Sequence, residues 1–155
     1  MFKKQSALQS AKANMALVMI FTLINYVLFL LDMSILFPFS MFTPLLLGSW
    51  ATQSIQSGYI VEAIIYISIV VLVFGGFLGS YLALAKKPKL MILGLIIYIL
   101  DTTAMIFIYT SFGGFEWVID AIFHVWVIAS MAYAIVNMFK TPKGLEVGED
   151  KPFEQ

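Results

Sequence analysis

The sequence predicts an all-α integral membrane protein: a bundle of four transmembrane helices with a short outer helix that is interfacial or re-entrant. The first observation is composition, because the 155 residues are 61% hydrophobic and only 12% charged. A soluble domain of this size cannot bury so much apolar surface. The second is the presence of four apolar runs of roughly the 20 residues that cross a bilayer. The third is the placement of the lysines, which fits an even number of spans.

The lysines define the expected topology. All nine basic residues are lysines, and they occur only near the two ends of the chain and in the middle connection. They are Lys3, Lys4, Lys12, Lys86, Lys87, Lys89, Lys140, Lys143 and Lys151. Because cytoplasmic loops carry the positive charge, we expect a multi-pass protein of the cell membrane with both termini in the cytoplasm. The same lysines suit anionic lipid headgroups as partners.

Several classes of chemistry are excluded by residues and motifs that the chain lacks. It has no cysteine, so disulfides, thiolate catalysis and thiol metal sites are ruled out. It has no arginine, and therefore no guanidinium clamp for phosphate or carboxylate. There is no glycine-rich phosphate loop and no G-x-S-x-G elbow. Nothing in the sequence indicates nucleic-acid binding.

The first span is expected over about 14–37, after a cytoplasmic tail at 1–13. Its polar residues form one stripe with Phe29, because Thr22, Asn25, Phe29 and Asp32 follow a 3-4-3 spacing. Asp32 falls near the outer end of this span. The stripe predicts one face that packs against polar groups inside the bundle.

The connection after the first span is too apolar for an ordinary loop and too short to cross the bilayer. Thr43 followed by Pro44 is typical of a helix start, with a capping side chain and a proline in the first turn. Gly58 is a natural stop. We therefore expect a short outer helix at about 44–56, either interfacial and anchored by Trp50 or re-entrant as a lid over a cavity.

Three further spans are expected over about 59–85, 90–110 and 116–139, followed by a disordered cytoplasmic tail at 140–155. Two pairs of small residues in the second span, Gly75 with Gly79 and Gly76 with Ser80, allow close helix approach. We interpret them as packing sites within the bundle, with homodimerisation as the alternative. Whether the protein forms an oligomer or has a partner subunit therefore stays an open question.

The candidate site centres on His124, the only histidine in the chain. Glu116, Asp120 and His124 recur every four residues and share one helix face. Asp101 in the preceding span is the expected partner, since both it and His124 lie roughly 12–14 Å below the outer surface. Ionisable groups at this depth usually face a cavity or a partner. The predicted pocket comprises Asp32, Glu62, Asp101, Asp120 and His124, supported by Asn25, Tyr66 and Tyr98.

This constellation supports several interpretations. The simplest is structural, in which an Asp–His pair fixes the register of two helices. A pocket for a cation, a proton or a small ligand is the functional interpretation, in a protein of binding, accessory or transport-related type. The alternative is an intramembrane metal-dependent hydrolase or lipid-modifying enzyme. In that case Asp101, Asp120 and His124 would hold a divalent cation such as zinc, with Glu62 as the general base.

One resemblance accompanies these inferences. The run 117–127, which contains Asp120 and His124, is similar to the last span of small four-helix bacterial membrane proteins. The run 98–101 and the region around Asp32 are similar as well. The resemblance covers the four spans but not the tails. That group carries no established activity, so the resemblance implies a topology and no function.

Overall fold

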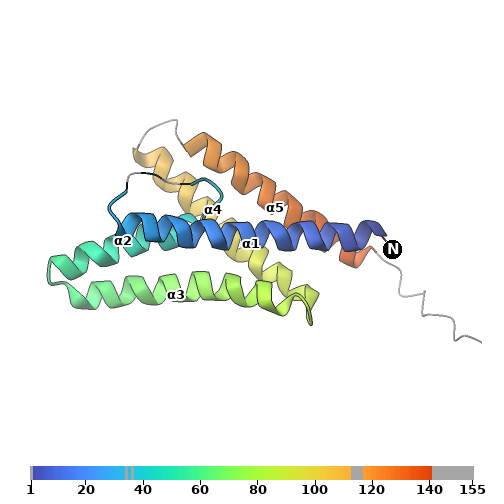
Figure 1. Cartoon of the computed structure of the whole chain (residues 1–155), viewed down its shortest axis with the longest axis horizontal. Coiled ribbons are helices and arrows are strands. Elements are labelled where there is room, and N and C mark those ends of the chain that lie inside the picture. Colours follow the sequence, from blue (N-terminus) through green and yellow to red (C-terminus); the bar gives the residue numbers. More distant parts are fainter. Residues whose placement is uncertain (1, 34, 36, 113–116, 141–155) are drawn as a thin grey trace, which may run out of the picture.

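The computed structural model describes residues 2–33, 35, 37–112 and 117–140, and within them the regular elements are all helices (Figure 1). They are α1 (Phe2–Leu30), α2 (Phe42–Gln56), α3 (Ile60–Ala83), the short 3-10 helix η1 (Pro88–Leu90), α4 (Met91–Phe112) and α5 (Trp117–Phe139). The expected all-α class is confirmed. Residues 141–155, for which a disordered tail is predicted, and Glu116 lie outside the described residues.

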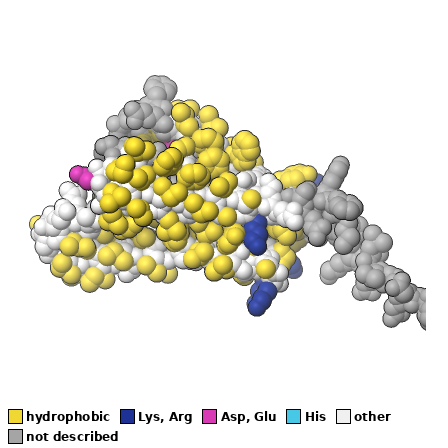
Figure 2. All heavy atoms as spheres, viewed as in Figure 1, with side chains coloured by type: hydrophobic (Ala, Val, Ile, Leu, Met, Phe, Trp, Pro, Cys, Tyr) yellow, Lys and Arg dark blue, Asp and Glu magenta, His cyan; other side chains and the backbone are white. Residues whose placement is uncertain are grey.

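Four of these helices are long and apolar enough to cross a membrane. The segments are Ala7–Leu30, Ile60–Ala83, Pro88–Ser111 and Trp117–Phe139. In Figure 2 hydrophobic side chains cover most of the visible surface of the bundle. Among them are Val61 and Leu72 of α3, which are 73% and 72% exposed. Such a surface is suited to a lipid bilayer, so the fold is that of a multi-pass membrane protein.

The long helices form a bundle in which α1 packs along α5, α3 packs along α4, and α4 also contacts α5. The buried core is apolar and rich in methionine, with Met15, Met91 and Met131 fully enclosed beside Phe77. The small-residue pair Gly76 and Ser80 faces this core, as predicted. An added Cβ at Gly76 would lie 2.9 Å from Ile97. The other predicted pair does not pack, since a Cβ at Gly75 or Gly79 would meet nothing within 4 Å.

The first span differs from the expectation at both of its ends. The helix already begins at Phe2, so most of the expected tail at 1–13 is continuous with it. It ends at Leu30 instead of continuing to about 37, because Asp32 adopts a left-handed conformation with φ of 56°. The Asp32 N–H bonds the Phe29 carbonyl at 3.1 Å, and the Met33 N–H bonds the Leu28 carbonyl at 3.0 Å. This is a Schellman motif, and aspartate is one of the few residue types that tolerate its left-handed position.

The short helix α2 starts inside the bundle and runs outward. Its first turn contacts Asp101, which lies halfway along α4, and Figure 1 shows α2 emerging near the C-terminal end of α1 before the chain turns into α3. The stop at Gly58 is confirmed. Gly58 has φ of +83°, and the Tyr59 N–H bonds the Ser54 carbonyl at 2.8 Å to close the helix end. The sharp reversal packs α2 mainly on α3.

Charge is separated between the two ends of the bundle. Figure 2 shows lysine side chains toward the end that holds the N-terminus and an acidic side chain at the opposite end. Lys12 of α1 lies at the lysine-rich end with its Nζ 5.5 Å from the centre of the Tyr81 ring of α3. Lys86 and Lys87 follow α3 at the same end. This asymmetry gives the bundle a polarity along its axis.

Candidate functional site

Asp101 occupies the middle of α4 and is 2% exposed. Its carboxylate accepts two backbone hydrogen bonds from the first turn of α2. The Phe42 N–H donates to Oδ2 at 3.0 Å, and the Thr43 N–H donates to Oδ1 at 2.7 Å. A carboxylate at a helix N-terminus is stabilised by both the free N–H groups and the helix dipole. Asp101 therefore caps α2 from another helix.

The other N–H groups of this helix start are also satisfied. The Met41 N–H donates to the Thr22 hydroxyl at 2.8 Å, and Pro44 has no N–H to satisfy. The predicted cap by Thr43 is wrong, because the N-cap residue is Met41 and no side chain of the segment caps the helix. A local cap is unnecessary here because α1 and α4 supply the acceptors.

Asn25 of α1 secures the non-helical segment that leads into α2. Its side-chain amide donates to the Phe37 carbonyl at 2.7 Å and to the Ser40 hydroxyl at 2.9 Å, and its oxygen accepts from the Phe37 N–H at 2.8 Å. Asn25 itself is 1% exposed. Non-helical backbone inside a membrane protein requires such internal partners. The polar side chains of the stripe on α1 thus form hydrogen bonds with backbone groups of the segment that follows the helix.

His124 of α5 is 1% exposed, and its two ring nitrogens have different surroundings. Nδ1 lies 2.9 Å from the backbone carbonyl of Asp120. A carbonyl oxygen can only accept, so this hydrogen bond places a proton on Nδ1. Nε2 has no hydrogen-bond partner within the described part of the chain and lies 3.6 Å from Oδ2 of Asp101.

The Nε2 contact has a direct chemical consequence. In a neutral ring with Nδ1 protonated, Nε2 presents a lone pair to a carboxylate oxygen, and the two atoms repel each other. A proton on Nε2, or another cation beside both atoms, makes the contact attractive. The pair formed by Asp101 and His124 is therefore an acceptor of positive charge, buried in the bundle.

Tyr98 is stacked on the histidine ring. The two ring centres are 4.9 Å apart with an interplanar angle of 5°. Its hydroxyl is buried and has no hydrogen-bond partner among the described residues. Tyr98 also contacts Phe77 of α3, with ring centres 5.7 Å apart. Tyr98 therefore fixes the plane of the imidazole, and with it the direction of Nε2.

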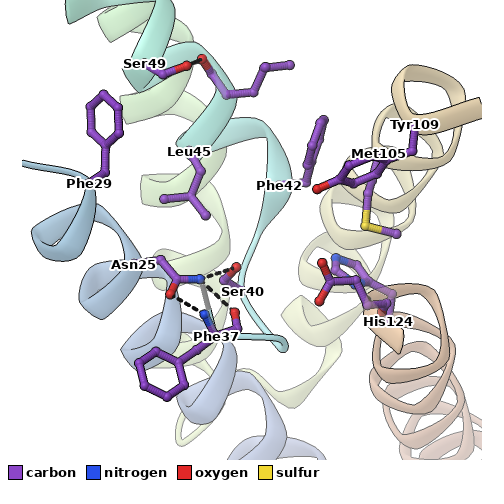
Figure 3. Close-up of a pocket in the computed structure, with 12 residues that line it drawn as sticks. Asn25, Phe29, Phe37, Ser40, Phe42, Leu45, Ser49, Met105, Tyr109 and His124 are labelled. Carbon is purple, nitrogen blue, oxygen red and sulfur yellow. Dashed lines mark hydrogen bonds between the residues drawn. The ribbon is translucent and has the colours of Figure 1, made fainter. Parts of the chain in front are cut away.

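A cavity of about 220 Å³ lies next to His124, enclosed by α1, α2, α4, α5 and the segment before α2. Its polar lining comes from Asn25, Ser40, Ser49, Tyr109, Asp120 and His124, and its apolar lining from Phe29, Phe37, Phe42, Leu45, Leu46 and Met105. Figure 3 shows the amide of Asn25 on one side of this cavity and His124 on the other, with Phe42 and Met105 above the histidine. Asp101, whose Oδ2 lies 3.6 Å from Nε2 of His124, is not among the residues that line the cavity.

The predicted site residues do not share one pocket. Asp101, Asp120, His124, Tyr98 and Asn25 line the cavity or lie next to His124. Glu62 and Tyr66 line a separate hollow between α2 and α3. Asp32 lies at the C-terminal end of α1, in a third hollow with Phe29 and Gln56. Glu62 is separated from the other predicted pocket residues because of how α3 is rotated about its own axis. The sequence alone does not determine that rotation.

The predicted metal set can be tested against the geometry. Among the described residues no group of three or more His, Asp or Glu side chains is close enough to hold a metal ion. Asp101 already accepts two backbone N–H groups, and Nδ1 of His124 is engaged by a carbonyl. Glu62, the predicted general base, lies in another hollow. The described residues therefore do not fit a zinc centre.

Sequence reasoning missed the residues contributed by the segment before α2 and by α2 itself. Ser40, Phe42 and Ser49 line the cavity although no motif distinguishes them. Thr22 and Asn25 could have been connected to this segment, because their stripe on α1 requires polar partners. No family model, curated protein or solved structure matches this chain. The class therefore rests on the fold alone, a multi-pass helical membrane protein.

Proposed function

We propose that this chain is a small membrane protein of binding or transport-related type, whose pocket accepts a cation, a proton or a small ligand. The pocket is the cavity bounded by Asn25, Asp120 and His124, with Asp101 beside the histidine. In this proposal both termini lie in the cytoplasm and the cavity opens toward the exterior. The lysines gathered at the end of the bundle that holds the N-terminus support that orientation.

One observation carries the proposal. Nε2 of His124 is buried, directed at a carboxylate oxygen 3.6 Å away, and without a hydrogen-bond partner in the described structure. A purely structural Asp–His pair would bring the two groups into hydrogen-bond distance, about 2.7–2.9 Å for a charged pair. The longer separation leaves the nitrogen able to take a proton or the positive group of a ligand.

The cavity supports the same function by its lining. Aromatic and aliphatic side chains alternate in the wall with polar groups that fix the orientation of a ligand, as in small-molecule sites. None of the lining residues is a lysine, and the carboxylate of Asp120 belongs to the wall. Such a lining favours a ligand with a positive group and an apolar body over an anion.

Nitrogen NMR on the histidine tests this proposal. The chain has a single histidine, so ¹⁵N-histidine labelling gives one pair of ring signals. We expect the Nδ1 signal to be that of a protonated nitrogen, and the Nε2 signal to shift saturably when tetramethylammonium is added. The ionisable side chains nearest the ring are Asp101, Tyr98 and Asp120, so Asp101→Asn should weaken this response.

Glu62→Gln is the matched control, because Glu62 lies in another hollow and should leave the response of the ring signals unchanged. Asp120→Asn provides a second test if Asp101→Asn fails to fold, since the Asp120 carboxylate lines the same cavity. Ring signals that stay constant at every concentration of tetramethylammonium would contradict the proposal. They would mean that the pair is a sealed structural contact that no cation reaches.

A further inference from the structure

The hollow between α2 and α3 is separate from the histidine cavity and is built differently. It has a volume of about 400 Å³. Its lining consists of Trp50, Gln53, Ser54 and Ser57 on the α2 side and Tyr59, Glu62 and Tyr66 on the α3 side. The tight turn at Gly58 holds the two sides together, because the Tyr59 N–H bonds the Ser54 carbonyl at 2.8 Å across it. The hollow is thus formed by two packed helices and not by a mobile loop.

Aromatic rings form the walls of this hollow. The rings of Trp50 and Tyr66 are 5.7 Å apart at an interplanar angle of 60°, so they are tilted against each other and not stacked. Tyr59 contributes a third ring at the rim and is 61% exposed. The faces of Trp and Tyr rings carry partial negative charge and attract cations. Three such rings line this one hollow.

The charge in the hollow comes from Glu62. Its carboxylate has one hydrogen bond in the described structure, a long one of 3.5 Å from the Ser54 hydroxyl. No basic residue lines the hollow, and the lysines of the described chain gather at the opposite end of the bundle. One carboxylate with neutral hydroxyl and amide groups provides too few hard oxygen ligands for a bound calcium ion. Carboxylate and aromatic faces together suit an alkylammonium group.

We propose that this hollow binds an alkylammonium group, with Glu62 as its counter-ion and Trp50, Tyr59 and Tyr66 as its aromatic walls. Two sources share this chemistry: the headgroup of a zwitterionic lipid, and a free quaternary amine. The first is consistent with the position of the hollow, since Trp and Tyr side chains are enriched at the level of lipid headgroups. This site does not depend on the function proposed for the histidine cavity.

The fluorescence of Trp50 can report binding directly. The chain has three tryptophans, so Trp117→Phe with Trp126→Phe leaves Trp50 as the only indole. This variant is placed in nanodiscs of pure phosphatidylglycerol, whose headgroup lacks an amine, and titrated with choline. We expect a saturable change in Trp50 emission. Glu62→Gln and Tyr66→Leu should each weaken the apparent affinity for choline by up to about fivefold.

Nanodiscs of phosphatidylcholine distinguish the two sources. If the lipid headgroup is the ligand, the emission is already shifted in these discs and added choline has no further effect. If a free amine is the ligand, choline produces the same saturable change in both discs. Asp32→Asn is the matched control, because it removes another exposed acid outside the hollow and should leave the titration unaltered.

Two results would overturn the proposal. The first is an emission that is insensitive to choline and identical in both kinds of nanodisc. The second is a saturable response that Glu62→Gln and Tyr66→Leu both leave unchanged, which would place the binding elsewhere. Glu62 is exposed, so Glu62→Gln should not unfold the bundle. A single elution peak in size exclusion for each variant checks this directly.

Discussion

The cap that Asp101 forms on α2 leads to a quantitative prediction about how firmly α2 is seated. Asp101→Ala removes the acceptor of the Phe42 and Thr43 N–H groups. A buried N–H left without a partner costs roughly 1–3 kcal/mol, so the two together destabilise the seated helix by roughly 2–6 kcal/mol. The population in which the helix start is open to water should then rise between about 30-fold and about 2 × 10⁴-fold.

Asp101→Asn should have an intermediate effect, because a carboxamide keeps one acceptor oxygen and loses the other. One orphaned N–H predicts a loss of roughly 1–3 kcal/mol, which is about 5-fold to about 150-fold in the open population. The open population should therefore be largest in Asp101→Ala, smaller in Asp101→Asn and smallest in the parent protein. Loss of a net charge without loss of a cap would not produce this order.

Cysteine labelling measures the opening. The chain has no cysteine, so Met41→Cys provides a single thiol at a position that is 0% exposed beside the cap. The rate of reaction with a water-soluble maleimide should rise by the factors above when Asp101 is changed. Glu62→Gln removes an acid that does not contact α2's first turn and serves as control. Equal labelling rates in the parent and in Asp101→Ala would refute the capping argument.

Three other predictions test the fold. Asn25→Leu removes three hydrogen bonds to the segment before α2 and should lower unfolding stability in micelles by about 2 kcal/mol. Gly48→Ala places a Cβ 2.6 Å from the Tyr26 ring and should cost about 1–3 kcal/mol, whereas Gly75→Ala meets open space and should be neutral or stabilising. A reporter fused after Gln155 should be active only in the cytoplasm, and an exterior signal would reverse the topology.

The spans were predictable because their signal is one of composition over many residues. Hydrocarbon excludes charge, and this alone defines four apolar helices and pairs the two ionisable groups deepest within them. Asp101 and His124 were expected to be partners on depth, and their nearest atoms are 3.6 Å apart. The end of the first span was missed, because one left-handed residue at Asp32 overrides an apolar pattern that continues beyond it.

The cap itself had no local signal. Capping rules apply to residues near a helix start, and they favoured Thr43, while the actual acceptor lies 58 residues further along the chain. The sequence could not predict that Glu62 and Asp32 lie in other hollows either, since their positions depend on how each helix is rotated about its axis. Sequence periodicity gives the polar face of one helix, but not the neighbour that the face meets.

Two polar residues of the bundle contribute both to holding α2 and to the histidine site. Asn25 binds the backbone before α2 and also lines the cavity, while Asp101 caps α2 and also faces His124. A proton or ligand that changes the charge beside Asp101 must therefore change how strongly that carboxylate holds the start of α2. Linkage requires the converse, so the cavity must bind the ligand with different affinities when α2 is seated and when it is open, by the same factor as the ligand changes the seating equilibrium. Labelling at Met41→Cys with and without ligand measures that coupling, and equal rates would show that the cavity and α2 are independent.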